Sequence, residues 1–373
     1  MRLALVISSL TPGGAEKVMA MLANYWASQN NDVTLFTLSN EAGTVAEPLS
    51  DKILCRPLGL LRPARTRWHG VASNLRRAHV LRRVLKHTNP DVVVSFIERT
   101  NVLVLLATIG LHFPVVVSER VDPKEYRIPF YWRILRILLY RRAASLVVQS
   151  PNILSSLNAW LRPRARVIPN PVLRPAWQSG GVGRKWKQDS SRQQIVALGR
   201  LTRQKGFDLL IRAFADVAER FPDWDLVIWG EGEKRVELET LRDQLDLNDR
   251  VALPGWTTQP AEKLVGAELF VLASRFEGFP NALCEAMACG LPVIATDCPS
   301  GPSDIVRHEV DGLLVRNEDS DALARAMERL MADRRLRKEL GRRAEEIVKR
   351  FSMEKVMEIW EETLKESRSG LTS

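Results

Sequence analysis

The 373-residue sequence lacks several features that would define its class at once. No stretch reaches the about 18 apolar residues that a membrane-spanning helix needs, so we expect no transmembrane segment. Its apolar N-terminus is short and has no small-residue cleavage site, which favours a first buried strand over a signal peptide. The cysteines show no metal-binding spacing and fit a reducing cytoplasm. They are Cys55, Cys284, Cys289 and Cys298.

Acidic residues are scarce in the first half of the chain. Residues 1–175 hold 24 Lys and Arg against 10 Asp and Glu, whereas residues 176–373 hold 30 against 34. Ten basic residues and no acidic one stand between Asp51 and Asp91. This imbalance predicts an anionic partner for the first half. Because no motif for reading nucleic acid is present, we expect an anionic membrane surface, or a lipid diphosphate within it, rather than nucleic acid.

Two basic stretches of this half also carry apolar residues. Residues 62–86 intersperse arginines with Trp68, Val71, Leu75, Val80, Leu81, Val84 and Leu85, and residues 131–142 are shorter and more apolar. Each stretch fits a helix that lies in a membrane interface, or a helix that packs on a core and exposes its polar face. The lack of acidic residues over 52–90 favours membrane contact.

Apolar runs rich in β-branched residues recur along the chain and predict parallel strands buried on both faces. They lie at residues 2–8, 33–38, 91–97, 114–118, 146–150, 166–168, 195–199, 224–229, 251–253, 269–273 and 292–296. A Pro- and Gly-rich polar stretch interrupts the alternation and predicts a linker at 171–194. We therefore expect an α/β protein with two doubly wound domains, residues 1–170 and 195–350, and a crevice between them.

The segment 274–292 carries the strongest functional signal. It follows the predicted strand 269–273, turns through a Gly-Phe-Pro sequence and enters a short helix. A helix that begins at the carboxyl end of a strand is where α/β sheets bind phosphate. Glu277 in the loop and Glu285 in the helix could then bind sugar hydroxyls on either side of a diphosphate. The alternative is an ordinary strand–loop–helix with two surface glutamates.

Two further motifs follow strands. The loop Gly199-Arg200-Leu201-Thr202-Arg203-Gln204-Lys205-Gly206 is cationic, and Arg binds a diphosphate with paired hydrogen bonds while Lys acts as a point charge. A solvated basic loop is the alternative. Gly13-Gly14 precedes a predicted helix over 15–28 and lets the backbone approach a ligand. It is not a G-x-G-x-x-G sequence, so a dinucleotide site is weakly supported.

Together these motifs resemble the retaining glycosyltransferases of family 4, which have the GT-B fold. The pair Glu277 and Glu285 is similar to the family's Glu-x7-Glu signature, and the basic loop is similar to its Gly-Arg…Lys-Gly element. The resemblance is specific over residues 195–316 and looser before them. It implies two Rossmann-like domains that face a cleft, and a C-terminal helix within residues 351–373 that returns to the first domain.

The resemblance also implies roles for individual residues. Arg200 and Lys205 would hold the donor pyrophosphate, Glu277 would bind the transferred sugar near the reacting carbon, and Glu285 would bind the ribose. The expected catalytic residues are Glu277, Arg200 and Lys205. The expected donor-binding residues are Gly14, Arg200, Lys205, Gly230, Trp256, Glu277, Gly278, Phe279, Pro280, Asn281, Ala282, Leu283 and Glu285.

Candidates for the acceptor or the reaction centre lie in the first half. In the family the loop at Gly13 faces the cleft near donor phosphate and acceptor. Arg120 stands where many members have a histidine, and this departure puts the histidine's role in doubt. Arg120 could instead neutralise a phosphate, or be a surface arginine. Glu98 and Asn101 follow a predicted strand and are weaker candidates.

The resemblance thus implies a retaining glycosyltransferase, and the acid-poor first half favours its peripheral binding to the inner face of the plasma membrane. It would move a hexose or N-acetylhexosamine from a nucleotide-sugar, UDP being favoured over GDP, to a polyprenyl-diphosphate-linked saccharide. Since no Asp-x-Asp pair stands at a suitable site, we expect no metal and no other cofactor. A nucleotide-sugar epimerase on the same fold and a non-catalytic nucleotide-sugar-binding protein remain alternatives.

Overall fold

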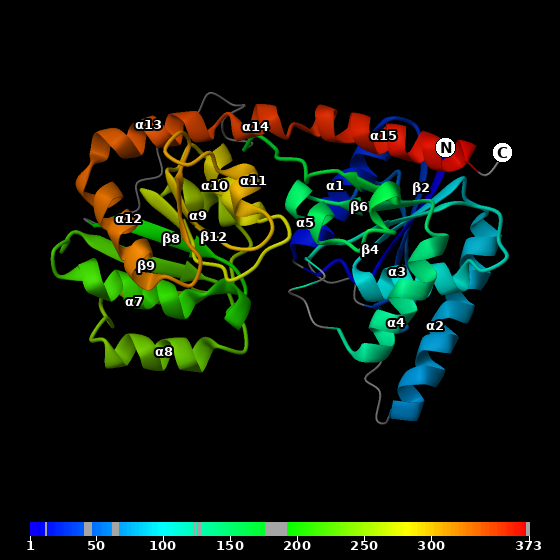
Figure 1. Ribbon diagram of the computed structural model, residues 1–373, viewed down its shortest axis with the longest axis horizontal. Helices are drawn as coiled ribbons and strands as arrows, with labels where there is room; N and C mark the ends of the chain where they lie inside the picture. Colours follow the sequence, from blue (N-terminus) through cyan, green and yellow to red (C-terminus); the bar gives the residue numbers. More distant parts are fainter. Residues whose placement is uncertain are drawn as a thin grey trace. The chain divides into compact units, whose positions relative to one another are not determined.

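The computed structural model describes residues 1–11, 13–40, 47–61, 67–122, 124, 128–175 and 192–370. The chain divides into two compact units, each built around its own parallel sheet (Figure 1). The first unit comprises Met1–Asn170 and Glu354–Ser373, and the second comprises Pro171–Met353. Most of the predicted linker, residues 176–191, lies outside the described residues.

The first unit has a seven-stranded sheet in the order β3-β2-β1-β4-β5-β6-β7. Its strands are β1 (Arg2–Ile7), β2 (Asp32–Thr37), β3 (Leu54–Pro57), β4 (Val92–Phe96), β5 (Val115–Ser118), β6 (Ser145–Val148) and β7 (Ala165–Val167). Its helices are α1 (Gly14–Ser28), α2 (Arg67–Thr88), α3 (Glu98–Ala107), α4 (Phe130–Leu139), η1 (Tyr140–Arg142), α5 (Pro151–Ser156), η2 (Arg162–Arg164) and α15 (Met353–Ser369).

Strand β3 is the element of this sheet that the apolar runs did not predict. It pairs with β2 at the edge of the sheet, and all four of its residues are exposed. Because an exposed edge strand buries no side chains, no apolar run marks it in the sequence.

The C-terminal helix α15 packs within the first unit. Its buried Trp360 lies edge-on to Trp26 of α1, with ring centroids 5.8 Å apart, and stacks on Phe96 of β4 at 6.2 Å. Aromatic pairs of this kind contribute about 0.5–1.5 kcal/mol beyond the burial of their area. The last helix of the chain therefore completes the core of the first unit.

The second unit has a six-stranded parallel sheet in the order β10-β9-β8-β11-β12-β13. Its strands are β8 (Gln193–Leu198), β9 (Trp224–Trp229), β10 (Val251–Gly255), β11 (Leu269–Leu272), β12 (Val293–Asp297) and β13 (Leu313–Arg316). Its helices are η3 (Arg203–Lys205), α7 (Phe207–Ala218), α8 (Arg235–Gln244), α9 (Pro260–Val265), α10 (Asn281–Ala288), α11 (Pro302–Ile305), α12 (Ser320–Ala332), α13 (Arg334–Ala344) and α14 (Ile347–Arg350).

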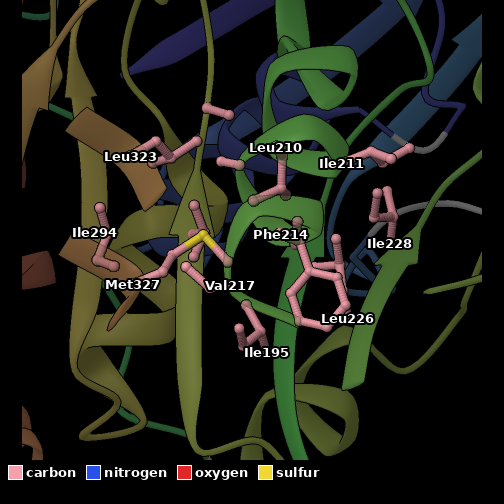
Figure 2. Packing of buried hydrophobic residues seen from close by; sticks show 14 of the residues in the cluster. Ile195, Leu210, Ile211, Phe214, Val217, Leu226, Ile228, Ile294, Leu323 and Met327 are labelled. Atoms are coloured by element: carbon pink, nitrogen blue, oxygen red, sulfur yellow. The ribbon is translucent and has the colours of Figure 1, made fainter. Parts of the chain in front are cut away.

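Both faces of this second sheet are covered by helices. Ile195 of β8 packs with one face of α7, whose Leu210, Phe214 and Val217 recur at helical spacing (Figure 2). Val196, the next residue of β8, belongs to the other core cluster, together with residues of α10. Helices on both faces of a parallel sheet define the doubly wound architecture, which confirms the predicted class of fold.

Each sheet has one point where the order of its strands reverses. In the first unit β1 lies between β2 and β4, and in the second unit β8 lies between β9 and β11. The loops after the two central strands leave in opposite directions, so a crevice opens at the carboxyl ends. The fold therefore indicates one candidate ligand region in each unit, after β1 and β4 and after β8 and β11.

Candidate active site

The loops after β8 and β11 are packed directly on each other at the switch point of the second unit. Gly206 has a φ of +63°, and a Cβ there would lie 2.0 Å from the carbonyl oxygen of Ala273. The Arg275 amide donates to the carbonyl of Gln204 at 2.8 Å, and Gln204 Nε2 donates to the carbonyl of Phe276 at 3.0 Å. Only glycine fits at position 206, and this fit lets the two motif loops meet.

The centre of this contact joins the two predicted motifs. Lys205 Nζ lies 2.6 Å from Glu277 Oε1, although the two residues are 72 positions apart in the sequence. The side chains are only 17% and 7% exposed, so the ion pair is largely shielded from water. Ser274, which is fully buried, donates its hydroxyl to the same carboxylate oxygen at 2.6 Å. The structure thus brings Lys205 and Glu277 together and adds Ser274, which sequence reasoning missed.

A second set of ion pairs fixes the backbone of the same loop. Arg275 donates to both carboxylate oxygens of Asp208, at 2.8 and 2.7 Å, and contacts Glu318 at 2.8 Å. Asn317 Nδ2 donates to the Arg275 carbonyl at 3.0 Å. Burial alone would raise the pKa of Asp208, but the Arg275 hydrogen bonds outweigh it and hold that pKa below its ordinary value. Arg275 therefore braces the loop from which Glu277 projects.

Arg200 lies on the β8 side of the site. It is exposed and follows directly after the strand and Gly199. Across the residues that the structure describes, its guanidinium has no hydrogen bond or ion pair to another side chain. A cation without a protein partner at a switch point can bind the phosphate oxygens of a ligand.

Helix α10 begins at the carboxyl end of β11, close to where the sequence placed it. The Leu283 amide donates to the Pro280 carbonyl at 3.0 Å, so this amide is already used in the first turn. The Phe279 side chain is buried and packs edge-to-face on Phe351 at 5.6 Å, which leaves only its backbone for a ligand. Glu285 is half-buried one turn after Asn281, on the same face of the helix.

The turn before α10 is packed against a neighbouring loop. Gly278 and Pro280 are buried, and Ala282 is half-buried in the first turn of the helix. A Cβ at Gly301 would lie 3.0 Å from both the Gly278 carbonyl oxygen and Pro280 Cδ. The backbone of this turn is therefore held close to the Gly301 loop.

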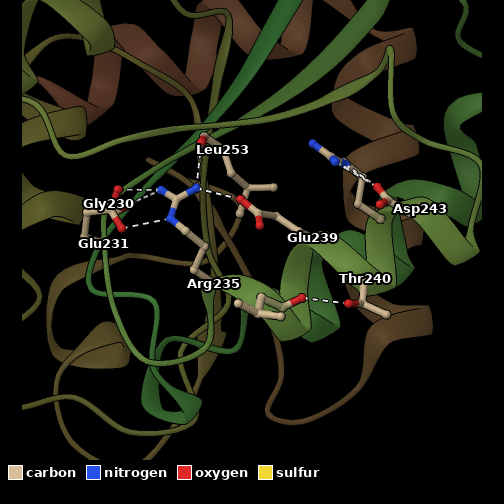
Figure 3. A network of polar contacts seen from close by, with 9 residues as sticks. Gly230, Glu231, Arg235, Glu239, Thr240, Asp243 and Leu253 are labelled. Atoms are coloured by element: carbon tan, nitrogen blue, oxygen red, sulfur yellow. Dashed lines mark hydrogen bonds and ion pairs between the residues drawn. The ribbon is translucent and has the colours of Figure 1, made fainter.

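The loop after β9 packs against the start of the basic loop of residues 199–206. Gly230 has a φ of +154°, and a Cβ there would lie 1.8 Å from the Gly199 carbonyl oxygen. Arg235 holds this loop by contacting Glu231 at 2.6 Å, Glu239 at 2.9 Å and the Leu253 carbonyl at 3.0 Å (Figure 3). Trp256, which follows β10, is half-exposed. Gly230 and Trp256 thus lie at the same edge of the sheet as Arg200 and Glu277.

A buried thiol lies near the carboxylate. Burial raises the pKa of Cys298 to about 12, and the negative charge of Glu277 adds to the increase. The thiol is therefore protonated at neutral pH and unsuited to act as a nucleophile. Within the described ranges, no group of three or more His, Cys, Asp and Glu side chains is arranged to hold a metal ion.

The candidate residues of the first unit lie around its own switch point. Helix α1 begins at Gly14, the second glycine of the pair, one residue before the predicted start. A Cβ at Gly13 would lie 2.2 Å from Glu16 Oε2, so the Glu16 carboxylate covers this glycine. After β4, Ile97 has a φ of +75°, which is strained for a β-branched residue. Such strain is concentrated at functional sites.

Arg120 follows β5 and is held in an unusual environment. Its guanidinium carbon lies 3.4 Å from the centroid of the Phe96 ring, and Nη1 donates to Asn170 Oδ1 at 2.6 Å. Nε and Nη2 are buried and have no hydrogen-bond partner among the described residues. Burial lowers the pKa of Arg120 well below its ordinary value, and the nearby Glu16 carboxylate opposes this only in part. Two buried, unsatisfied donors on a cationic side chain suit an anionic ligand.

Glu98 and Asn101 differ in what they could bind. The fully buried Asn101 accepts a hydrogen bond from Ser95 at 2.7 Å, and it donates to the Ser118 carbonyl at 2.9 Å and to Tyr140 at 3.1 Å. Its polar atoms are engaged within the core, which favours a structural role. Burial, reinforced by the carboxylate of Glu119, raises the pKa of Glu98.

Solved structures similar to this chain share its fold. Sucrose-phosphate synthase from Thermosynechococcus elongatus has a TM-score of 0.84 and 20% identity, with 99% of each chain covered. The HepE protein of Anabaena, in complex with UDP and glucose, has a TM-score of 0.78 and 19% identity, with 98% of this chain and 99% of that chain covered. These similarities show the fold alone.

Family profiles cover both units. Residues 183–347 match the family described as glycosyl transferases group 1, and residues 13–171 match the glycosyl transferase 4-like domain. The chain belongs to the glycosyltransferases of the GT-B fold. A relative of this glycosyltransferase in Campylobacter jejuni is 27% identical over 99% of this chain and 100% of its own. Its name is GalNAc-alpha-(1->4)-GalNAc-alpha-(1->3)-diNAcBac-PP-undecaprenol alpha-1,4-N-acetyl-D-galactosaminyltransferase.

The predicted site residues of the glycosyltransferase thus fall into two groups. Those of the second unit lie around the Lys205–Glu277 contact, in the loops after β8, β9, β10 and β11. Gly13, Gly14, Glu98, Asn101 and Arg120 lie in the first unit, in loops and helix starts after β1, β4 and β5. Ser274 carried no signal in the sequence beyond its position at the end of an apolar strand.

Proposed function

We propose that this glycosyltransferase moves a hexose or N-acetylhexosamine from a UDP-sugar to a polyprenyl-diphosphate-linked saccharide, in the assembly of a surface polysaccharide or glycan. The observation that supports it best is the shielded Lys205–Glu277 contact at the switch point of the second unit. Support for the substrates comes from the C. jejuni relative, whose name includes an undecaprenol-linked saccharide, and from the Anabaena protein solved with UDP and glucose.

The second unit would bind the donor. Arg200 and Lys205 neutralise the diphosphate, and an ammonium group with three donors can contact phosphate oxygens while it keeps its bond to Glu277. Glu277 binds hydroxyls of the transferred sugar, and Glu285 binds the ribose. The loops at Gly230 and Trp256 surround the nucleobase. The turn from Gly278 to Leu283 offers backbone amides to phosphate and sugar.

The transfer proceeds with retention, by substitution on one face of the sugar. The leaving diphosphate accepts the proton of the acceptor hydroxyl as the new glycosidic bond forms and the bond to phosphate breaks. The protein mainly stabilises charge on the departing diphosphate, a contribution that fixed cations make before the reaction begins. Proton NMR of the first product tests this mechanism, since an inverted anomer would contradict it.

Arg200 and Lys205 supply the positive charge that a divalent ion provides in other transferases, so we propose turnover without a metal. Unchanged turnover in EDTA is the expected result. Loss of turnover in EDTA, with recovery on adding Mg²⁺ or Mn²⁺, would contradict the proposal.

The first unit would bind the acceptor, with Arg120 on a phosphate of the lipid diphosphate and the loops at Gly13 and Glu98 near its sugars. The positive charge of this unit supports a peripheral position at the anionic inner face of the plasma membrane, and we propose no nucleic-acid partner. In the part of the chain that the structure describes, no helix is long and apolar enough to cross a bilayer.

Nucleotide release from purified protein tests the proposed reaction. The donors are UDP-GlcNAc, UDP-GalNAc, UDP-glucose, UDP-galactose and GDP-mannose, each with and without a polyprenyl-diphosphate-linked saccharide. Acceptor-dependent release from a UDP-sugar is expected. Epimerisation of a UDP-sugar without acceptor would instead identify an epimerase, and binding without turnover of any donor would identify a non-catalytic protein.

A further inference from the structure

The two basic amphipathic stretches, which look alike in the sequence, differ in what their apolar residues contact. In α2 the apolar residues Ala78, Leu81 and Leu85 are buried in the core of the first unit. The side chains of residues 67–71, which include Trp68 and Val71, lie outside the described side chains. Over its described part, α2 therefore packs mainly on the core and exposes basic residues, although its Leu75 is 60% exposed.

Helix α4 has the opposite arrangement. It exposes five large apolar side chains, from 38% for Ile137 to 67% for Phe130. We call this set the α4 apolar face. Its members are Phe130, Tyr131, Ile134, Ile137 and Leu138. The opposite side of the helix is anchored, because Trp132 and Leu139 are buried in the core of the first unit.

The α4 apolar face forms one continuous stripe. Successive residues of a helix are rotated by about 100°, so its five members fall within an arc of about 120°. Arg133 lies just outside one edge of this arc and is exposed. A monomeric soluble protein rarely leaves such a set of neighbouring apolar side chains without a partner.

The charge around this face indicates which partner it fits. From Tyr126 to Asn170 the sequence holds eight arginines and no aspartate or glutamate. Arg133, Arg141 and Arg142 are exposed on α4 and η1, whereas Arg136 turns inward to Glu119 at 2.8 Å. Helix α3 packs against both α4 and α2, and Figure 1 shows α2 and α4 extending toward the same side of the first unit. Arg76 and Arg83 of α2 are also exposed, so both helices carry basic residues in solvent.

We propose that α4 is the element by which the first unit inserts into an anionic lipid surface. The α4 apolar face enters the boundary between headgroups and acyl chains, while Arg133, Arg141 and Arg142 contact lipid phosphates. A second copy of the chain is a poorer occupant, because a symmetric contact through α4 would bring like-charged arginines together. The proposal rests on the proposed function, since the lipid-linked acceptor would lie in the same bilayer.

Flotation with lipid vesicles tests the surface. The vesicles contain phosphatidylcholine with about a third of anionic phosphatidylglycerol, at low salt. The double variant Ile134→Ser/Leu138→Ser should reduce the bound fraction at least tenfold. The matched control is Val236→Ser, because Val236 is 73% exposed on α8 of the second unit and should not contribute. Arg133→Gln/Arg141→Gln should weaken binding to anionic vesicles only.

A fluorescent reporter distinguishes insertion from adsorption by charge alone. Cys55 is the exposed cysteine, whereas the other three are buried, so Cys55→Ser gives a background for labelling. A polarity-sensitive dye on Leu138→Cys should shift to the blue when vesicles are added. The same dye on Val236→Cys should not shift. An equal spectral shift at the two positions on adding vesicles would overturn the proposal.

Further outcomes separate this proposal from the proposed function. Transfer to a water-soluble short-chain acceptor should stay within twofold in the α4 double variant, while transfer to a vesicle-borne long-chain acceptor should fall at least tenfold. If no form transfers sugar yet flotation depends on α4, the proposed function fails and the lipid surface stands. If wild type and double variant float equally, or if sedimentation shows that α4 mediates self-association without vesicle binding, the α4 proposal is overturned.

Discussion

The two units share one architecture but hold their candidate residues differently. In the second unit Lys205 already contacts Glu277, Ser274 fixes the same carboxylate, and Arg275 braces the loop. In the first unit Arg120 is half-buried, and its buried Nε and Nη2 have no hydrogen-bond partner among the described residues. Lys205 thus already contacts an anionic side chain, whereas the Arg120 guanidinium keeps two buried donors without a hydrogen-bond partner in the described part of the chain.

The two arrangements differ in how they affect catalysis and stability. Groups that are already held in place by hydrogen bonds need little rearrangement during the reaction. They can therefore stabilise the charge of a leaving diphosphate effectively. A buried cation with unsatisfied donors destabilises its unit, and a site that awaits an anionic ligand tolerates that cost. Changes in the second unit should therefore act on donor binding and turnover, and changes in the first unit on acceptor binding and stability.

The largest effect is expected from Glu277→Gln. The amide keeps the shape of the side chain but loses the charge that holds Lys205 and the sugar hydroxyls. Transfer should fall on the order of 10³-fold, while UDP affinity stays within about threefold. Initial rates and UDP titration measure both. Glu262→Gln, an exposed glutamate of α9, is the matched control. Retained activity in Glu277→Gln would remove its catalytic role.

Ser274→Ala should have the next largest effect. The change removes one hydrogen bond to a buried carboxylate, and such bonds contribute about 1.5–3 kcal/mol. We expect kcat to fall by about 10-fold or more, with the donor KM changed by less than about threefold. Steady-state kinetics separate the two constants, and Ser155→Ala on the surface of α5 is the control. A purely structural role would instead lower the unfolding temperature and leave kcat per folded molecule unchanged.

Arg120→Met tests the unsatisfied cation of the first unit. Replacing a buried, poorly paired charge with an apolar side chain is often stabilising, so the free energy of unfolding should rise by about 1 kcal/mol. The acceptor KM should rise by about 10-fold through loss of a charged hydrogen bond, with UDP affinity unchanged. Urea unfolding and acceptor titration provide the data, with exposed Arg99→Met as control. Destabilisation together with an unchanged acceptor KM would show that Arg120 is structural.

The smallest effect concerns Glu98 and depends on pH. Burial and Glu119 raise its pKa, so the folded state favours the protonated form. The stability that Glu98 contributes is then greatest at low pH and is lost as the pH rises through the raised pKa. The free energy of unfolding of Glu98→Gln should equal that of wild type near pH 4 and exceed it by about 1 kcal/mol at pH 7. Urea unfolding at both pH values, with exposed Glu358→Gln as control, checks this. A difference that does not change with pH would contradict it.

The sequence predicted most strands, because buried parallel strands need continuous apolar runs. It missed β3, which is exposed at the sheet edge, and β13, which is only partly buried. Glu277 and Lys205 could be identified as candidates because each lies in a motif. Ser274 and the Arg275–Asp208 brace could not, since they depend on the close packing of two loops at Gly206.

The α2 and α4 stretches show another limit of sequence patterns. Both combine arginines with apolar residues at helical spacing, so the sequence allowed membrane contact or core packing for each, and the lack of acidic residues over 52–90 favoured membrane contact. Only tertiary packing decides which face is covered: Leu81 and Leu85 of α2 are buried, whereas Ile134 and Leu138 of α4 are exposed. Amphipathicity predicts that a helix has an apolar face, not what that face contacts.

The assignment of donor binding to the second unit is tested most directly by calorimetric titration of UDP into wild type, Lys205→Met and the α4 double variant. Wild type and the α4 variant should bind UDP with equal affinity. Lys205→Met should bind at least about 10-fold more weakly, because a charged contact to the diphosphate is lost. Equal affinity in wild type and Lys205→Met would contradict the assignment.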